Sequence, residues 1–203
     1  MILPRSYFDD LYSMSADPWG LATRSYEARK YAITVASLPR LRYRRIYEPG
    51  CSIGVLTRML AARGDRVVAS DISLAALATA RRGGLPANVS LDQASAPDEW
   101  PAGRFDLIVL SELGYYFGEA ELGTFIRRSR ASLEADGHLL AVHRRKRVSD
   151  YPRTAAQVHR QLRSSGFTSL ACYTDDHFLL EVFGATAQAA LTGPDCEHQA
   201  IRQ

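Results

Sequence analysis

The segment from Ile46 to Asp71 constrains the fold more than any other part of this chain. It begins with Ile-Tyr-Glu-Pro-Gly-Cys-Ser-Ile-Gly, continues with a stretch of helical apolar spacing, and ends in Val-Val-Ala-Ser-Asp. Gly50 lets the backbone turn sharply and approach a ligand, and Gly54 lets the following helix pack closely. The segment therefore predicts a strand, a tight glycine turn, a helix and a second parallel strand.

Asp71 stands at the carboxyl end of that second strand. Ligands bind at this edge of an open α/β sheet, and a carboxylate there can accept hydrogen bonds from both ribose hydroxyls. The structural alternative is that Asp71 only caps the helix expected over Leu74–Arg82. The agreement of turn, spacing and carboxylate favours a nucleoside pocket.

The same architecture serves dinucleotides, whose fingerprint is G-x-G-x-x-G with a second glycine that admits a pyrophosphate. Here Ser52 stands where that second glycine belongs. Glu48 places a negative charge beside the loop, which would repel a pyrophosphate and suit a cationic or amino-bearing ligand. The loop therefore favours a nucleoside with a short tail that carries no phosphate.

Three runs give the chain a family resemblance. They are Glu48-Pro-Gly-Cys-Ser-Ile-Gly-Val-Leu-Thr, Asp71, and Phe105-Asp-Leu-Ile-Val-Leu-Ser-Glu-Leu-Gly-Tyr-Tyr. They resemble the class I S-adenosylmethionine-dependent methyltransferases, and most closely the nodulation protein S (NodS)-like family, over residues 7–183. The resemblance implies S-adenosylmethionine as cofactor, whose sulfonium and ammonium groups suit Glu48. It also implies a Rossmann-like doubly wound seven-stranded sheet with an antiparallel last strand.

The rest of the chain continues an alternation of strands and helices, which is typical of an α/β fold. An N-terminal helical lid is expected over 1–40, a cofactor-binding methyltransferase domain over 41–183, and a mobile tail over 184–203. The expected strands are 44–48, 66–71, 89–93, 105–111, 137–143, 168–174 and 177–183, and the expected helices are 54–63, 73–82, 119–134 and 154–164.

Composition excludes several other classes of protein. The chain has 203 residues, which suits one domain, and a formal net charge of +3 with scattered basic residues, so nucleic-acid binding is not expected. Cys51, Cys172 and Cys196 show neither zinc spacing nor a disulfide framework, which favours a reducing cytoplasm. We expect neither a secretory leader nor a membrane span, and the oligomeric state stays open.

Cofactor contacts are expected along the strand ends and from the N-terminal segment. The resemblance places Trp19, Tyr26 and Arg29 or Lys30 near the methionine end, although these side chains could equally pack as a core helix. It assigns the cofactor to Glu48, Gly50, Cys51, Gly54, Asp71, Ile72, Ala94, Ser95, Ser111, Tyr26 and Arg29.

Candidate catalytic groups follow the fourth and fifth strands. His143 ends an apolar run and is the first choice for a base, because its ordinary pKa lies near neutrality. Glu112 and Tyr115 follow the fourth strand, and Glu112 is a second candidate base. The alternatives are that His143 is a satisfied structural residue and that Glu112 caps the next helix. No paired acidic cluster follows the fourth strand, so no metal is expected.

Tyr116 and Tyr151 are the expected substrate contacts. The run Arg144–Arg147 could steer an anionic substrate, although such runs more often form a solvated loop. Tyr26 and Lys30 match the Y-x-x-x-K spacing of short-chain dehydrogenases, but they precede the glycine loop, whereas that chemistry needs them after it. A dehydrogenase is therefore not the expected class.

Methyl transfer to a small molecule is the leading functional hypothesis. The resemblance suggests N-methylation of an amino sugar or saccharide. The alternatives are O-methylation of a small hydroxylated metabolite and a binding protein that holds S-adenosylmethionine without turnover.

Overall fold

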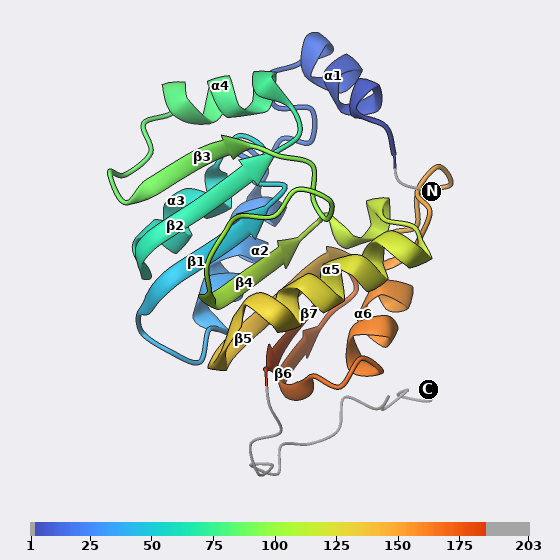
Figure 1. Ribbon diagram of the computed structural model, residues 1–203. Coiled ribbons are helices and arrows are strands. Elements are labelled where there is room, and N and C mark those ends of the chain that lie inside the picture. Colours follow the sequence, from blue (N-terminus) through green and yellow to red (C-terminus); the bar gives the residue numbers. More distant parts are fainter. Residues whose placement is uncertain (1–2, 186–203) are drawn as a thin grey trace.

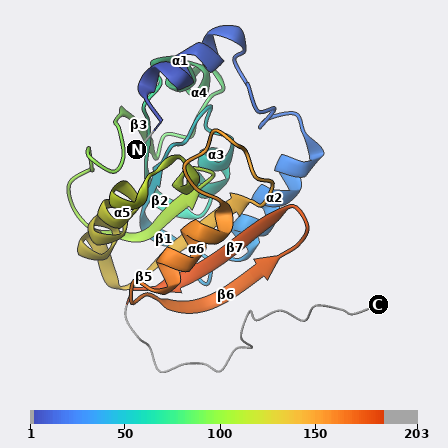
Figure 2. The same cartoon turned by 90° about the vertical axis from the view of Figure 1, so that its right-hand side faces the viewer.

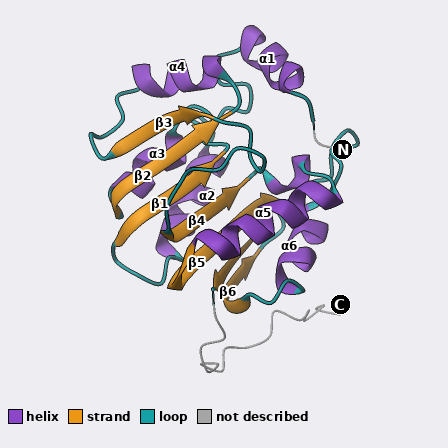
Figure 3. Cartoon of the chain, viewed as in Figure 1, coloured by secondary structure: helices purple, strands orange, loops and turns teal. Residues whose placement is uncertain are grey.

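The computed structural model describes residues 3–185, and these contain one mixed sheet of seven strands in the order β3-β2-β1-β4-β5-β7-β6 (Figures 1 and 3). Most of the predicted tail, residues 186–203, lies outside the described residues. The strands are β1 (Tyr43–Pro49), β2 (Gly64–Asp71), β3 (Val89–Gln93), β4 (Phe105–Ser111), β5 (Leu133–Arg144), β6 (Thr168–Thr174) and β7 (Phe178–Gly184).

Strands β1 to β5 pair in parallel, while β7 pairs antiparallel with both β5 and β6. The last strand is therefore inserted between β5 and β6, which confirms the predicted doubly wound sheet with an antiparallel last strand. The turn before β7 is tight because the Asp175 carboxylate accepts hydrogen bonds from the amides of His177 and Phe178, at 2.8 and 2.9 Å.

Helices cover both faces of the sheet. In Figure 1, α5 and α6 lie in front of the sheet, with α2 and α3 behind it, and Figure 2 shows α1 beside α4 at one end. The helices are α1 (Arg5–Met14), α2 (Ser25–Ala36), α3 (Val55–Ala61), α4 (Leu74–Arg82), the short 3₁₀ turn η1 (Gly114–Tyr116), α5 (Glu119–Ser132) and α6 (Ala155–Arg163).

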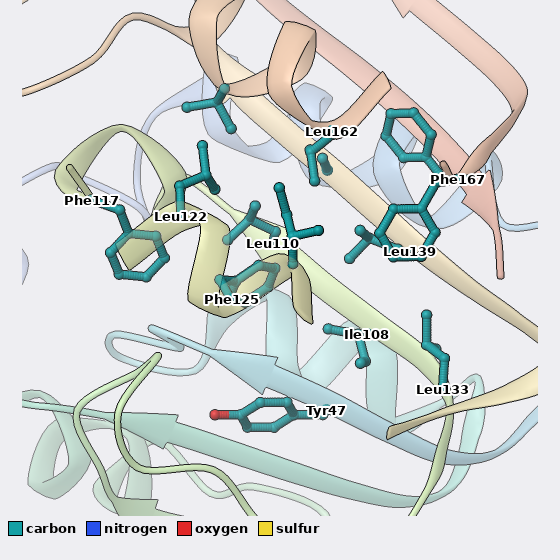
Figure 4. Packing of buried hydrophobic residues seen from close by; sticks show 14 of the residues in the cluster. Tyr47, Ile108, Leu110, Phe117, Leu122, Phe125, Leu133, Leu139, Leu162 and Phe167 are labelled. Carbon is teal, nitrogen blue, oxygen red and sulfur yellow. The ribbon is translucent and has the colours of Figure 1, made fainter. Parts of the chain in front are cut away.

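Every residue of β4 is buried, as expected for a central parallel strand between two helical layers. Alternate residues of this strand enter different cores: Ile108 and Leu110 pack with Leu122 and Phe125 of α5 (Figure 4). On the opposite face, Leu107 and Val109 of β4 pack with residues of α2 and α3. Each fully buried aliphatic side chain contributes about 1.5–3 kcal/mol.

The N-terminal segment, expected to be helical over 1–40, contains two helices within its described part. These are α1 and α2, separated by a turn over residues 15–24. The Asp17 carboxylate accepts hydrogen bonds from the amides of Leu21 and Ala22 at 2.8 and 2.9 Å, and Pro18 has no amide hydrogen to donate. The Asp17-Pro18 pair therefore favours a turn at this point.

Candidate functional site

A deep cavity opens at the carboxyl ends of β1, β2 and β4, under the N-terminal segment. It has an empty volume of about 1310 Å³, including its open mouth. Most of the residues expected from the sequence line it: Glu48, Gly50, Cys51, Asp71, Ile72, Ala94, Ser95, Ser111, Glu112, Tyr115, Tyr116 and Tyr151.

The loop after β1 has the backbone that its glycines predict. Gly50 has a φ of 70°, and a Cβ added there would lie 3.0 Å from the Leu113 side chain. Ser52 also has a positive φ, of 51°, which is uncommon for a residue other than glycine. Gly54 does not line the cavity; a Cβ there would lie 3.2 Å from side chains of Ala80 and Leu85, so its role is helix packing.

Asp71 fixes this loop as well as lining the cavity. One carboxylate oxygen accepts the amide hydrogen of Ser52 at 2.8 Å, and the other accepts that of Ser73 at 2.9 Å. Burial raises the pKa of Asp71, although both amide hydrogen bonds favour its ionised form. Each oxygen keeps a further lone pair, so the carboxylate can accept ribose hydroxyls while it holds the loop.

Glu48 brings a buried carboxylate to the cavity. Its side chain is buried, with 2% of the residue exposed, and its Oε2 atom has no hydrogen-bond partner within the part of the chain that the structure describes. Burial, with the nearby charge of Asp71, raises the pKa of Glu48 to about 8. A buried carboxylate is costly unless a donor or a cation reaches it. This oxygen therefore fits an ammonium group bound beside the glycine loop.

The N-terminal segment closes the cavity with residues that the sequence reasoning mostly missed. Trp19 lines the cavity as expected. Tyr12, Glu27 and Tyr31 also line it, and none of these three was predicted from the sequence. The Tyr12 hydroxyl makes a short hydrogen bond with the Ser52 hydroxyl, which joins α1 to the glycine loop. The density of aromatic residues in this segment was the available indication, but their helical spacing did not say which of them face inward.

Tyr26 and Arg29 do not line the cavity. Tyr26 packs its ring edge against His177 and Phe178. Arg29 forms an ion pair with Asp175 at 2.7 Å. Both residues therefore fasten α2 to the turn before β7.

Glu112 lies at the mouth of β4 in a charged network with α2. Its Oε1 atom lies 2.9 Å from Lys30 Nζ, and its Oε2 atom accepts a short hydrogen bond from the Tyr115 hydroxyl. Lys30 is 1% exposed and also lies 2.7 Å from Glu27. Glu112 has a φ of 53°, a strained conformation that persists only where the surroundings impose it, and such strain is concentrated at functional sites.

Three tyrosines form the outer wall of the cavity. The rings of Tyr115 and Tyr151 stack with centroids 5.0 Å apart, and the Tyr116 ring meets both edge-on at 4.8 and 4.7 Å. The hydroxyls of Tyr116 and Tyr151 are 3.2 Å apart. Burial raises the pKa values of Tyr115 and Tyr116 well above their ordinary value, so both hydroxyls remain protonated at neutral pH.

His143 is not among the residues that line the cavity. It is completely buried, and the Gly114 amide donates a 3.0 Å hydrogen bond to its Nε2 atom. The proton is therefore on Nδ1, which donates to His159 Nε2 at 3.0 Å. His159 Nδ1 in turn donates to Glu181 at 2.6 Å. This placement does not support a base that faces the sulfonium.

Burial lowers the pKa of His143 well below its ordinary value, which keeps the ring neutral. The series of hydrogen bonds from Gly114 through His143 and His159 to Glu181 instead holds the turn η1 against β5 and β7. A Cβ added at Gly114 would lie 2.8 Å from His143 Nε2, so glycine is required there. We assign His143 a positioning role, because η1 carries Tyr115 and Tyr116.

Replacing His159 with leucine is expected to lower the free energy of unfolding by about 2–3 kcal/mol, because it leaves buried donors and acceptors without partners. Urea unfolding monitored by circular dichroism measures this change. Arg160→Ala, an exposed position on the same helix, is the matched control and should stay within about 0.5 kcal/mol of the wild type. Equal stability of the His159→Leu variant and the wild type would contradict the positioning role.

The chain is similar to known methyltransferases. The family model of the methyltransferase domain matches residues 46–137, which include the glycine loop, Asp71 and Glu112. Nodulation protein S of Rhizobium tropici is 31% identical over 127 residues, covering 61% of this chain and 53% of that protein. The chain thus spans about half the length of this curated relative.

Solved structures extend the similarity. A crystal structure described as a methyltransferase from Pseudomonas syringae is 42% identical, with a TM-score of 0.70, over 79% of this chain and 99% of that one. The N-methyltransferase NodS from Bradyrhizobium japonicum, bound to S-adenosylhomocysteine, is 22% identical, with a TM-score of 0.79, over 89% and 97% of the two chains. That second likeness concerns the fold.

The chain therefore belongs to the class I S-adenosylmethionine-dependent methyltransferases, and part of it is similar to nodulation protein S. S-adenosylmethionine is the cofactor of this class of methyltransferases. None of the helices within residues 3–185 has both the length and the apolar character needed to cross a membrane.

Proposed function

We propose that this protein transfers the methyl group of S-adenosylmethionine to the amine of a small acceptor, with amino sugars and other amino-bearing saccharides as the first class to test. The observation that carries the proposal is Glu112, which is held in a strained conformation at the cavity wall and bonded to Tyr115 and Lys30. The acidic side chains of this wall favour an acceptor that arrives as an ammonium ion.

The residues of the cavity fit the cofactor. Glu48 would hold its ammonium group, Asp71 its ribose, and the apolar Ile72, with Ala94 and Ser95, its adenine. When bound, S-adenosylmethionine supplies an electrophilic methyl group on a sulfonium. The tasks left to the protein are to align the acceptor nitrogen, to remove its proton and to exclude water.

Glu112 is the residue that we assign to the proton. Its Oε2 atom already accepts a hydrogen bond from Tyr115, and an acceptor ammonium replacing or joining that donor could pass its proton to the carboxylate. Tyr116 and Tyr151 offer apolar ring faces with hydroxyl tips, a combination that suits a hydroxylated ring such as a sugar. The nitrogen that results is neutral and can attack in line.

Two other functions make different predictions. An O-methyltransferase would use hydroxyl acceptors whether or not a free amine is present, and a binding protein would take up S-adenosylhomocysteine without turnover of any acceptor. The cellular location of the protein is a separate prediction. The cysteine pattern of the sequence suggests the cytoplasm.

An acceptor panel tests the proposal. Release of S-adenosylhomocysteine is measured with glucosamine, with the disaccharide of glucosamine, and with their N-acetylated counterparts. We expect turnover with the free amines alone and an added methyl on nitrogen by mass spectrometry. Equal turnover of the N-acetylated sugars would favour O-methylation, and no turnover with any acceptor would favour the binding protein.

Glu112→Gln is expected to lower kcat/KM for the amine about 100-fold, because the side chain keeps its shape and loses its basicity. The affinity for S-adenosylhomocysteine should change little, which calorimetry can measure on the same sample. Glu134→Gln, at the far end of β5 beside Arg104, is the matched control and should keep wild-type turnover. Full activity of Glu112→Gln would remove Glu112 from the mechanism.

A further inference from the structure

Two cations line the cavity where β5 ends. Arg144 is the last residue of β5, and Lys146 follows two positions later; both are exposed residues that nevertheless contribute to the cavity wall. Within residues 3–185, neither side chain takes part in a hydrogen bond or an ion pair. An unpaired cation is ordinary on a convex surface, but here two of them border a cavity that also holds carboxylates.

The other two cations of this run, Arg145 and Arg147, do not line the cavity. Arg145 donates to the backbone carbonyl of Asp175, and the carboxylate of Asp175 is taken by Arg29. The Asp175 carboxylate is therefore already paired, and within residues 3–185 the side chains of Arg144 and Lys146 have no hydrogen-bond or ion-pair partner.

The other charged wall of the cavity is acidic. Glu27 and Glu112 both line the cavity and share a single buried cation, Lys30, at 2.7 and 2.9 Å. With both carboxylates ionised, this trio carries one uncompensated negative charge. The cavity therefore has carboxylates from α2 and from the residue after β4 on one wall, and cations from the last residue of β5 and the segment that follows it on the other.

A ligand that carries an amine and an anion matches this arrangement better than a simple amine. The anion would gain charge-assisted hydrogen bonds, and an arginine can bind a phosphate or carboxylate in a bidentate way. The cofactor's own carboxylate is a competing partner for these cations. Arg24 also lines the cavity, from the N-terminal segment that carries Trp19, and it is the candidate for that carboxylate.

We propose that the acceptor carries a phosphate or carboxylate in addition to its amine, and that Arg144 and Lys146 bind this anionic group. The inference rests on the proposed function, since it names the substrate class of the same site. It makes the basic run after β5 a specificity element that selects among amines, and it leaves the transfer chemistry to Glu112.

Binding of three matched probes to the complex with S-adenosylhomocysteine tests the inference without turnover. The probes are glucosamine, glucosamine 6-phosphate and 2-amino-2-deoxygluconate, titrated calorimetrically into the wild type, Arg144→Gln/Lys146→Gln and Arg147→Gln. We expect one of the two anionic probes to bind the wild type at least about tenfold more tightly than glucosamine. The double variant should lose this preference, and Arg147→Gln should keep it. Which anionic probe is preferred distinguishes phosphate from carboxylate.

Two results would overturn the inference. One is equal binding of all three probes by the wild type. The other is a double variant that keeps the preference, or that instead weakens S-adenosylhomocysteine itself, which would assign the cations to the cofactor. Methyl transfer to the same three probes is measured in a separate assay. Selective binding of an anionic probe with no methyl transfer would leave the anion subsite standing and reject the proposed function.

Discussion

Replacing Asp71 with alanine is expected to weaken the binding of S-adenosylhomocysteine by about 100-fold or more, since each lost hydrogen bond to a charged group contributes about 1.5–3 kcal/mol. The substitution removes the carboxylate that we assign to both ribose hydroxyls. It also leaves the amides of Ser52 and Ser73 without the carboxylate that now binds them at 2.8 and 2.9 Å. Isothermal titration calorimetry of the purified variant measures the affinity.

A matched variant separates this effect from general damage to the fold. Asp92 lies on the edge strand β3 and does not line the cavity, so Asp92→Ala should bind S-adenosylhomocysteine as the wild type does. Circular dichroism should show that Asp71→Ala keeps the native helix and strand content. A folded Asp71→Ala protein with wild-type affinity would show that the ribose lies elsewhere.

Glu48→Gln is expected to act in opposite directions on stability and on binding. The folded-state pKa of Glu48 is raised to about 8, while an unfolded glutamate titrates near about 4.3. Between these values the folded protein retains a proton that the unfolded chain has lost, so stability falls as pH rises through this window. At pH 8, the neutral glutamine should therefore raise the free energy of unfolding by about 1–3 kcal/mol. At pH 5, where Glu48 is already protonated in the folded state, the gain should be much smaller.

The same substitution removes the charge that we assign to the cofactor ammonium. The affinity for S-adenosylhomocysteine at pH 8 should fall about tenfold or more, because a charge-assisted hydrogen bond is replaced by a neutral one. Thermal unfolding at pH 5 and pH 8, together with calorimetry at pH 8, measures both effects. A variant destabilised at pH 8, or one that binds as tightly as the wild type, would contradict the role of Glu48.

The sequence was most informative where local rules and tertiary structure require the same residues. Gly50 has the positive φ that the predicted sharp turn requires, and β4 covers the strand expected over 105–111. The last strand is antiparallel, as the family resemblance implies. The edges of elements were less certain. Strand β5 begins at Leu133 and not at residue 137, because Leu133 pairs with Phe105 of β4 ahead of an irregularity in the register.

Side-chain direction is what the sequence could not supply. His143 ends an apolar strand in the way that a catalytic base could, but its partner His159 comes from α6, and only the packing of α6 on the sheet brings the two rings together. Lys30 was placed near the cofactor by its position on α2, yet its link to Glu112 joins residues 82 positions apart. Such contacts depend on helix rotation and docking, which periodicity alone leaves undetermined.

The central claim is that this cavity binds the cofactor of a methyltransferase and not a dinucleotide. Calorimetric titration of the wild-type protein with S-adenosylhomocysteine, and separately with NAD, tests it most directly. We expect one site per chain, a dissociation constant on the order of 1–10 μM for S-adenosylhomocysteine, and no measurable heat with NAD. Binding of NAD, or no binding of S-adenosylhomocysteine to the folded protein, would contradict the account.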